Sequence, residues 1–269
     1  MRTAIATVLL AGVAIAGAVS FDGAAKAPAT AQGSAQAEAP LERAARALPP
    51  PTRPAFTVGQ PRLLERGAAP SRSAPVSRRV LALALPREGA APVATLETQT
   101  EEGTTNVVLV LGEATRGGAL WVHVRLPVLP NNRTGWVPRD ALGGYRFLAT
   151  RLVVDRTRLS ITLFERGRPV FEAPIGVGTP SAPTPAGEFY VRLKLAGFND
   201  PFYGPVAFGT SARSDVLTDW PGGGYIGIHG TDAPELIPGR VSHGCVRMRN
   251  DDILALSRLI PVGTPLTIR

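Results

Sequence analysis

The sequence contains very little cysteine and histidine. Its 269 residues include one cysteine, Cys245, and three histidines. A single cysteine excludes an internal disulfide. Acidic residues are also the minority, with 21 Asp and Glu against 29 Lys and Arg, a formal net charge of +8. Beyond Val19 no apolar run approaches the roughly 20 residues that a membrane-spanning helix needs.

The N-terminus has the pattern of an export signal. Arg2 is followed by an apolar run from Ala4 to Val19 and then by small residues. This pattern predicts a secretory signal peptide over residues 1–25. We therefore expect the protein in the cell wall or periplasmic space, or tethered to the membrane if the signal is not cleaved.

Residues 26–79 are rich in Ala, Pro and Arg, with almost no aromatic residues. Such a segment cannot bury enough apolar surface to offset the entropy of ordering it, so it is interpreted as a disordered tether. Nine basic residues against three acidic ones give it a net +6 of the chain's +8. This charge suits contact with anionic wall polymers or a membrane surface, or it serves solubility alone. Export argues against a nucleic-acid partner.

Residues 80–148 contain short apolar stretches separated by Gly, Pro and Asn. In "LWVHVRL" alternation places Leu120 and the following even-numbered residues on one face, which predicts a half-buried strand. Asn131-Asn132 suits a turn that needs positive φ. The motifs "WVHVRLP" and "TGWVP" resemble bacterial SH3-like domains, so a small β-barrel is expected here. His123 is interpreted as a strand residue on the surface and not as a ligand.

Residues 149–269 are long enough for a core of their own. Two apolar strand candidates flank Glu165-Arg166-Gly167-Arg168, which predicts a β-hairpin. Near the end, Asn250 is expected to cap a helix with an apolar face of Ile253, Leu254, Leu256, Leu259 and Ile260, stopped by Pro261 and Gly263. The fold class predicted for the ordered chain is therefore mainly β with one late helix.

The stretch "SHGCVRM" offers a reactive face. If it is extended, His243, Cys245 and Arg247 project to one side. A thiol needs an adjacent base before it is a good nucleophile, and His229 or His243 could take its proton. The N–H groups of Gly244 and Cys245 could stabilise an oxyanion. This chemistry is cysteine-based acyl transfer.

Three other interpretations of these residues are open. Cys245 could be a buried structural residue. His229, His243 and Cys245 could bind zinc, although His-Gly-Cys spacing is tight for two ligands of one tetrahedral ion. The unpaired thiol could also form an intermolecular disulfide, which would explain neither histidine.

Several separated motifs agree with one family. "IHGTD" at 228–232 and "SHGCVRM" at 242–248 resemble the signature of the L,D-transpeptidase catalytic domain, the YkuD-like family. "GTPSAPTPAGEF" at 178–189 resembles the Pro-rich turn of that family. The resemblance covers about 120 residues and implies a β-rich catalytic domain over 149–269 behind the SH3-like barrel.

The resemblance also implies roles for the site residues. Cys245 would be the nucleophile and His229 the catalytic histidine, steadied through a backbone carbonyl, with Asp232 as an alternative partner. The substrate-binding or supporting positions would be Ser242, His243, Gly244, Arg247 and Gly230. No metal and no cofactor are implied.

The reaction of the family is peptide exchange in peptidoglycan. Its thiolate attacks the carbonyl of the third stem-peptide residue, releases D-alanine, and passes the acyl group to an amine of a neighbouring stem. β-Lactams of the carbapenem type are expected as covalent inhibitors. Two alternatives stay open: an L,D-carboxypeptidase, if water is the acceptor, and a wall-binding protein without catalysis.

Overall fold

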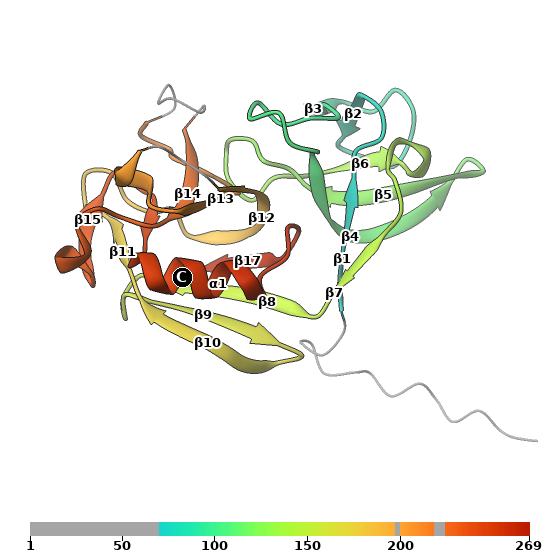
Figure 1. Cartoon of the computed structure of the whole chain (residues 1–269). Helices are drawn as coiled ribbons and strands as arrows, with labels where there is room; N and C mark the ends of the chain where they lie inside the picture. Colours follow the sequence, from blue (N-terminus) through green and yellow to red (C-terminus); the bar gives the residue numbers. More distant parts are fainter. Residues whose placement is uncertain (1–69, 197–199, 218–223) are drawn as a thin grey trace, which may run out of the picture. The chain divides into compact units, whose positions relative to one another are not determined.

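The computed structural model describes residues 70–196, 200–217 and 224–269. All of these residues belong to one compact unit of the chain, residues 60–269. The expected signal peptide and the expected tether as far as residue 69 lie outside the described residues. Within the described ranges the fold is mainly β with a single α-helix (Figure 1).

A seven-stranded antiparallel sheet occupies residues 71–148 in the order β3-β2-β6-β5-β4-β1-β7. Its strands are β1 (Ser71–Pro75), β2 (Val80–Leu83), β3 (Pro92–Leu96), β4 (Val107–Arg116), β5 (Ala119–Arg125), β6 (Thr134–Pro138) and β7 (Arg146–Leu148), with the 3₁₀ helix η1 (Arg139–Ala141). Buried Val, Leu and Ala side chains of these strands form a core of their own. The resemblance to SH3-like domains stays a prediction.

The predicted end of the tether, at residue 79, is wrong. Residues 71–75 lie within the range 26–79, yet they form strand β1 between β4 and β7. Ala74 is completely buried and Val76 is 3% exposed. A segment of low hydropathy can join a sheet because backbone hydrogen bonds, and not apolar side chains, supply most of the pairing. That contribution cannot be read from composition.

The alternation expected along β5 is only partly correct. Val122 and Val124 are fully buried, but Leu120 is 41% exposed and Trp121, on the other face, is 3% exposed. Leu120 lies near the tip of the β4–β5 hairpin, paired with Thr115. The tip extends beyond the core, so its inward face has nothing to pack against. The expected Asn turn is confirmed, since Asn132 has φ of 68°.

A ten-stranded sheet follows in the order β10-β9-β8-β17-β12-β13-β14-β16-β11-β15. Its strands are β8 (Thr150–Asp155), β9 (Ser160–Glu165), β10 (Arg168–Pro174), β11 (Gly176–Gly178), β12 (Gly187–Ala196), β13 (Val206–Arg213), β14 (Tyr225–His229), β15 (Gly239–Ser242), β16 (Val246–Arg247) and β17 (Pro265–Ile268). The expected hairpin is confirmed as β9 and β10, joined by Arg166 and Gly167 with φ of 49° and 78°.

Helix α1 (Asn250–Leu259) lies against β13 (Figure 1). Ile253 and Leu256 are fully buried, as the apolar pattern predicts, whereas Leu259 is 46% exposed at the last turn. The expectation that Asn250 caps this helix is wrong. The capping position is Arg249, and the side chain of Asn250 instead accepts a hydrogen bond from the N–H of Thr231 at 2.9 Å. Within the described ranges no helix is both long and apolar enough to cross a membrane.

Candidate active site

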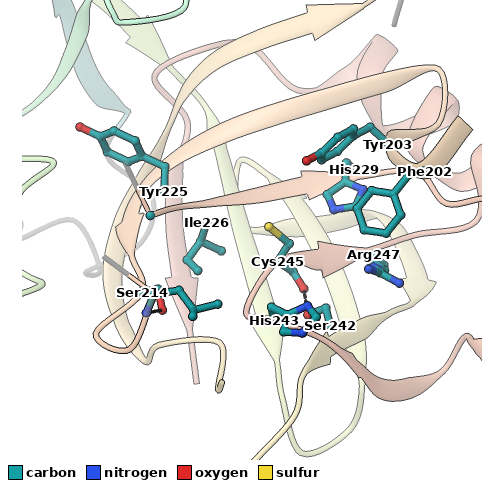
Figure 2. Close-up of a pocket in the computed structure, with 12 residues that line it drawn as sticks. Phe202, Tyr203, Ser214, Tyr225, Ile226, His229, Ser242, His243, Cys245 and Arg247 are labelled. Carbon is teal, nitrogen blue, oxygen red and sulfur yellow. Dashed lines mark hydrogen bonds between the residues drawn. The ribbon is translucent and has the colours of Figure 1, made fainter. Parts of the chain in front are cut away.

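A pocket opens at the ends of β14 and β16 and beside the 3₁₀ helix η2 (Pro201–Tyr203), as Figure 2 shows. All five predicted site residues that have functional side chains line it: Cys245, His229, Ser242, His243 and Arg247. The lining residues are Phe202, Tyr203, Ser214, Leu217, Gly224, Tyr225, Ile226, His229, Ser242, His243, Cys245 and Arg247. Gly230 and Gly244 do not line it.

Parallel pairing of β14 with β16 brings the two motifs together. Ile228 lies opposite Val246, and His229 lies opposite Arg247. Cys245 immediately precedes β16, and its Sγ accepts a hydrogen bond from the N–H of Gly227 on β14 at 3.3 Å. The thiol and the His229 ring line the same pocket (Figure 2). The full burial of Val246 anchors this segment to the core. The sheet therefore positions residues that are separated in sequence by an intervening loop.

His229 is held as a neutral imidazole. Its side chain lies in the interior, and its Nδ1 is 2.7 Å from the carbonyl oxygen of Gly230. Because a carbonyl only accepts, Nδ1 carries the proton and the Nε2 lone pair is left as a base. Burial lowers the pKa of His229 to about 4, and the nearby charge of Arg247 acts in the same direction, while the Gly230 carbonyl partly opposes both.

Cys245 is half-buried, and burial raises the pKa of its thiol. Two neighbours act against that shift without cancelling it: the N–H of Gly227, 3.3 Å from Sγ, and the charge of Arg247. The resting pair at neutral pH is therefore a thiol and a neutral imidazole. A thiol in this state can act as a nucleophile only if its proton is removed.

Two hydroxyl groups fix the backbone around the cysteine. Ser242 Oγ donates to the carbonyl of Cys245 at 2.6 Å and accepts from the N–H of Gly244 at 3.1 Å. Thr184 Oγ1 donates to the carbonyl of Gly244 at 2.7 Å and accepts from the N–H of Gly178 at 2.9 Å. The expected oxyanion pair is therefore incorrect in this state, because the N–H of Gly244 is already bonded to Ser242.

Both glycines of the motifs allow close backbone packing. Gly244 has φ of +121°, and a Cβ there would lie 2.9 Å from Ile226 Cδ1. At Gly230 a Cβ would collide with Asn250 Oδ1, the atom that accepts the Thr231 N–H. Both glycines therefore act through the backbone conformation and the close packing that they allow, since neither has a side chain.

Two aromatic residues of η2, Phe202 and Tyr203, lie at the site although no sequence motif indicated them. The ring centroids of Phe202 and Tyr203 lie 5.9 Å and 5.1 Å from that of His229. The Arg247 guanidinium carbon lies 4.5 Å from the Phe202 ring centroid. Asp200 begins this turn by accepting the N–H of Phe202 at 3.0 Å. The string "DPFYG" could have indicated the turn through its Asp-Pro start, but not its packing against His229.

The remaining predicted groups fall at the edge of the site. His243 lines the pocket from an exposed position. The partner found for His229 is the Gly230 carbonyl, as the resemblance implies, rather than Asp232. Among residues 70–196, 200–217 and 224–269, no group of three or more His, Cys, Asp or Glu side chains gathers where a metal ion could be held.

Comparisons with known proteins agree on one family. Residues 149–268 match the family model of the L,D-transpeptidase catalytic domain. The L,D-transpeptidase YkuD of Bacillus licheniformis is 35% identical over 118 residues, which is 44% of this chain and 64% of that protein. The Bacillus subtilis YkuD is 35% identical over 109 residues, 40% of this chain and 59% of that protein. The chain therefore spans less than two thirds of the length of these curated relatives.

Among solved structures, the Ldtfm-avibactam carbamoyl enzyme is 29% identical and covers 45% of this chain and 49% of its own, with a TM-score of 0.35. The family match falls on the ten-stranded sheet and its single helix. It also contains both motifs that meet in the pocket. Residues 149–268 form a YkuD-like L,D-transpeptidase catalytic domain.

Proposed function

We propose that this protein is an exported L,D-transpeptidase that remodels peptidoglycan by acyl transfer through Cys245. One observation carries the proposal. The thiol of Cys245 shares a pocket with His229, whose Nδ1 is bonded to a carbonyl so that Nε2 is left as a base. A nucleophile beside an oriented base is the arrangement that acyl transfer needs.

The first half-reaction is acylation. His229 Nε2 takes the thiol proton as Sγ attacks the carbonyl carbon of the third stem-peptide residue. The tetrahedral intermediate collapses, the C–N bond to D-alanine breaks, and the leaving amine takes the proton from the imidazolium. The product is a thioester on Cys245 and a free D-alanine.

The second half-reaction repeats this chemistry in reverse order. An amine of a neighbouring stem loses a proton to His229 and attacks the thioester carbonyl. The C–S bond breaks as the new amide forms, and the leaving thiolate takes the proton from the imidazolium, which restores the thiol. Water in place of the amine would give the carboxypeptidase reaction. In both steps the imidazole starts as a free base, because its pKa of about 4 leaves it unprotonated at neutral pH.

A small number of groups can stabilise the negative charge of the oxyanion and of the thiolate. The N–H of Cys245 is the donor left from the expected oxyanion pair, since Ser242 occupies the N–H of Gly244. The Gly227 N–H and the Arg247 charge both favour the thiolate over the thiol. Arg247 is held in place beneath the Phe202 ring.

Export and wall attachment complete the proposal. Residues 1–25 would direct the chain across the membrane, and the basic segment that follows would bind anionic wall polymers or the membrane surface through its charge. The partners are then peptidoglycan stem peptides, with carbapenems as covalent inhibitors.

Intact-protein mass after exposure to a carbapenem tests the nucleophile. Cys245 should attack the strained lactam carbonyl and open the ring. The released amine stays attached to the acyl group through the rest of the inhibitor, so the protein mass rises by one intact inhibitor. Cys245→Ala should show no adduct. An adduct of equal yield on that variant would refute the assignment of Cys245.

Product analysis with two tetrapeptide stems then tests the reaction. Cross-linked dimer and D-alanine indicate transpeptidation, and tripeptide with D-alanine indicates carboxypeptidation. Binding of stems without either product would support the alternative of a wall-binding protein.

A further inference from the structure

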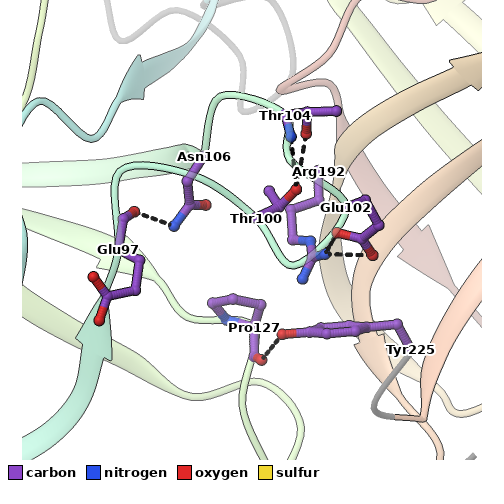
Figure 3. A network of polar contacts seen from close by, with 8 residues as sticks. All are labelled: Glu97, Thr100, Glu102, Thr104, Asn106, Pro127, Arg192 and Tyr225. Carbon is purple, nitrogen blue, oxygen red and sulfur yellow. Dashed lines mark hydrogen bonds and ion pairs between the residues drawn. The ribbon is translucent and has the colours of Figure 1, made fainter. Parts of the chain in front are cut away.

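Tyr225 lines the pocket and also contacts a residue of the N-terminal sheet region. It begins β14 and lines the pocket that contains Cys245 and His229. Its hydroxyl donates to the carbonyl of Pro127 at 3.2 Å, outside the catalytic domain (Figure 3). The Arg192 guanidinium carbon lies 3.8 Å from its ring centroid. One wall of the pocket is therefore supported by a side chain from β12 and a loop of the preceding domain.

Arg192 is itself held by the N-terminal domain. It is 3% exposed and makes two hydrogen bonds to the carboxylate of Glu102, at 2.8 Å and 3.0 Å. Burial is the largest single effect and would raise the pKa of Glu102, but the Arg192 charge and the hydrogen bonds to the carboxylate together outweigh it, so the pKa is lowered. The pair is therefore ionised. Both hydrogen bonds come from the same guanidinium nitrogen, Nη2. A charge-assisted contact of this kind is stronger than a hydrogen bond between neutral groups.

The turn that presents Glu102 is well ordered by its own hydrogen bonds (Figure 3). The N–H of Thr100 donates to the carbonyl of Thr104 at 2.8 Å, and the two hydroxyl groups lie 2.9 Å apart. Glu102 lies at the tip between them. The backbone of this hydrogen-bonded turn thus positions the Glu102 carboxylate beside Arg192.

A second contact reaches the same wall. Asn131 donates to the carbonyl of Arg213 at 2.7 Å and accepts its N–H at 2.9 Å, as a neighbouring strand would. Arg213 pairs with Tyr225 across β13 and β14, and its guanidinium carbon lies 4.6 Å from the Tyr225 ring centroid. Two separate loops of the N-terminal domain therefore converge on the first residue of β14.

This support acts on one side of the pocket. Figure 2 shows Tyr225, Ser214 and Ile226 on one side of Cys245, whereas Phe202 and its aromatic neighbours lie on the other. The supported side combines a phenol ring, a serine and apolar side chains. Such a surface fits a short peptide better than a compact charged group.

We propose that the side of the pocket walled by Tyr225 is a peptide-binding subsite whose shape is set by the N-terminal domain. Tyr225 is its specificity-determining residue, and Glu102 and Arg192 are positioning residues that act through it. The identity of the peptide as a peptidoglycan stem rests on the proposed function. The existence of the subsite and its dependence on Glu102 do not.

The test uses the full chain and a synthetic tetrapeptide that ends in D-alanine. Its affinity is measured on a Cys245→Ala background, where no turnover can occur, for Tyr225→Ala and Glu102→Gln. Tyr225→Ala should weaken binding about tenfold, and Glu102→Gln by several-fold, in keeping with the loss of one or two contacts. Glu102→Asp should restore part of the loss because it keeps the charge.

A matched control lies in the same domain. Glu97 forms an exposed ion pair with Arg79 at 2.8 Å, so Glu97→Gln makes the same chemical change away from Tyr225 and should leave affinity unchanged. With Cys245 intact, Glu102→Gln should raise KM with little change in kcat. Alkylation of Cys245 by iodoacetamide, which is too small to need the subsite, should keep its rate.

The outcomes separate the two proposals. Weakened binding in Glu102→Gln and Tyr225→Ala, with unchanged alkylation, supports the subsite even if no turnover of the peptide is found, and absent turnover would refute only the proposed function. Equal affinity in wild type, Glu102→Gln and Tyr225→Ala overturns the subsite. Slowed alkylation in Glu102→Gln also overturns it, since general disruption of the pocket would then be the cause. No measurable binding of the tetrapeptide overturns it as well.

Discussion

The Nδ1 atom of His229 lies 2.7 Å from the carbonyl oxygen of Gly230, the next residue in the chain. A backbone carbonyl cannot take up a proton at neutral pH, so this contact fixes the ring tautomer without adding a negative charge. Burial and Arg247 then keep the imidazole neutral. The site thereby obtains an oriented base without a carboxylate partner.

The first prediction concerns the rate of acylation. His229→Ala leaves a thiol whose pKa is raised by burial and removes the group that takes its proton. Acylation of Cys245 by a carbapenem at pH 7 should fall by roughly 10²–10⁴-fold, the range typical of a lost acid–base group. His243→Ala, at the exposed edge of the pocket, should cost less. Stopped-flow fluorescence or timed intact-protein mass measurements give both rates.

The pH profile supplies the control for that prediction. Wild type should acylate at a nearly constant rate between about pH 5 and pH 8, and lose activity only as His229 is protonated near its pKa of about 4. His229→Ala must rely on free thiolate, so its rate should rise about tenfold per pH unit in the same range. Parallel profiles in the two proteins would contradict the role of His229 as base.

A second prediction links the same residue to stability. In the unfolded chain the imidazole gains a proton as the pH falls through its ordinary 6.5, whereas in the fold it does so only near 4. The part of the free energy of unfolding that depends on a neutral His229 is therefore fully present above pH 6.5 and is lost as the pH falls toward 4. This loss amounts to about 3 kcal/mol. Urea unfolding of wild type and His229→Gln should show their difference narrowing over this interval.

How far the sequence predicts this site depends on the distance between partners in the chain. Cys245 and Arg247 lie on one short segment, and local alternation was enough to place both at the pocket. Glu102 and Arg192 are 90 residues apart, and neither lies in a motif. An ion pair of this kind follows from how two folded domains meet. Periodicity along a single strand carries no information about it.

Local patterns were also misleading where a side chain had two possible partners. Asn250 stands at a helix start with the composition of a cap, yet its oxygen serves Thr231 of another loop. The composition of residues 71–75 indicates a tether, yet their backbone pairs with two strands. The β9–β10 hairpin, by contrast, was predictable because both strands and the turn are adjacent in sequence.

A third prediction follows from the position of Asn250. Its side-chain oxygen accepts the Thr231 N–H at 2.9 Å and packs beside Gly230, the carbonyl partner of His229. Asn250→Ala should lower the free energy of unfolding by about 1–2 kcal/mol, because a partly buried N–H loses its acceptor. Asn250→Asp keeps the acceptor and should remain close to wild type. Thermal unfolding of the three proteins measures the effect, and equal losses in Ala and Asp would contradict it.

The final prediction concerns Thr184, a residue of the Pro-rich turn that does not line the pocket. Its buried hydroxyl links the N–H of Gly178 to the carbonyl of Gly244, the residue before Cys245. Thr184→Val keeps the side-chain shape but leaves the Gly178 N–H and the Gly244 carbonyl without their hydrogen-bond partner. The substitution should therefore lower the free energy of unfolding by about 2–4 kcal/mol. Thr184→Ser retains the hydroxyl and loses one methyl group, about 1 kcal/mol.

The two variants should also differ in chemistry. Without the hydrogen bond from Thr184 to the Gly244 carbonyl, the segment that contains Cys245 can shift relative to His229. Acylation by a carbapenem should therefore be slower in Thr184→Val, measured at a temperature where the protein is fully folded. Thr184→Ser should acylate at nearly the wild-type rate. Acylation rates and unfolding curves from the same preparations decide the matter. A Val variant that is destabilised yet acylates normally would show that Thr184 holds the fold without positioning Cys245.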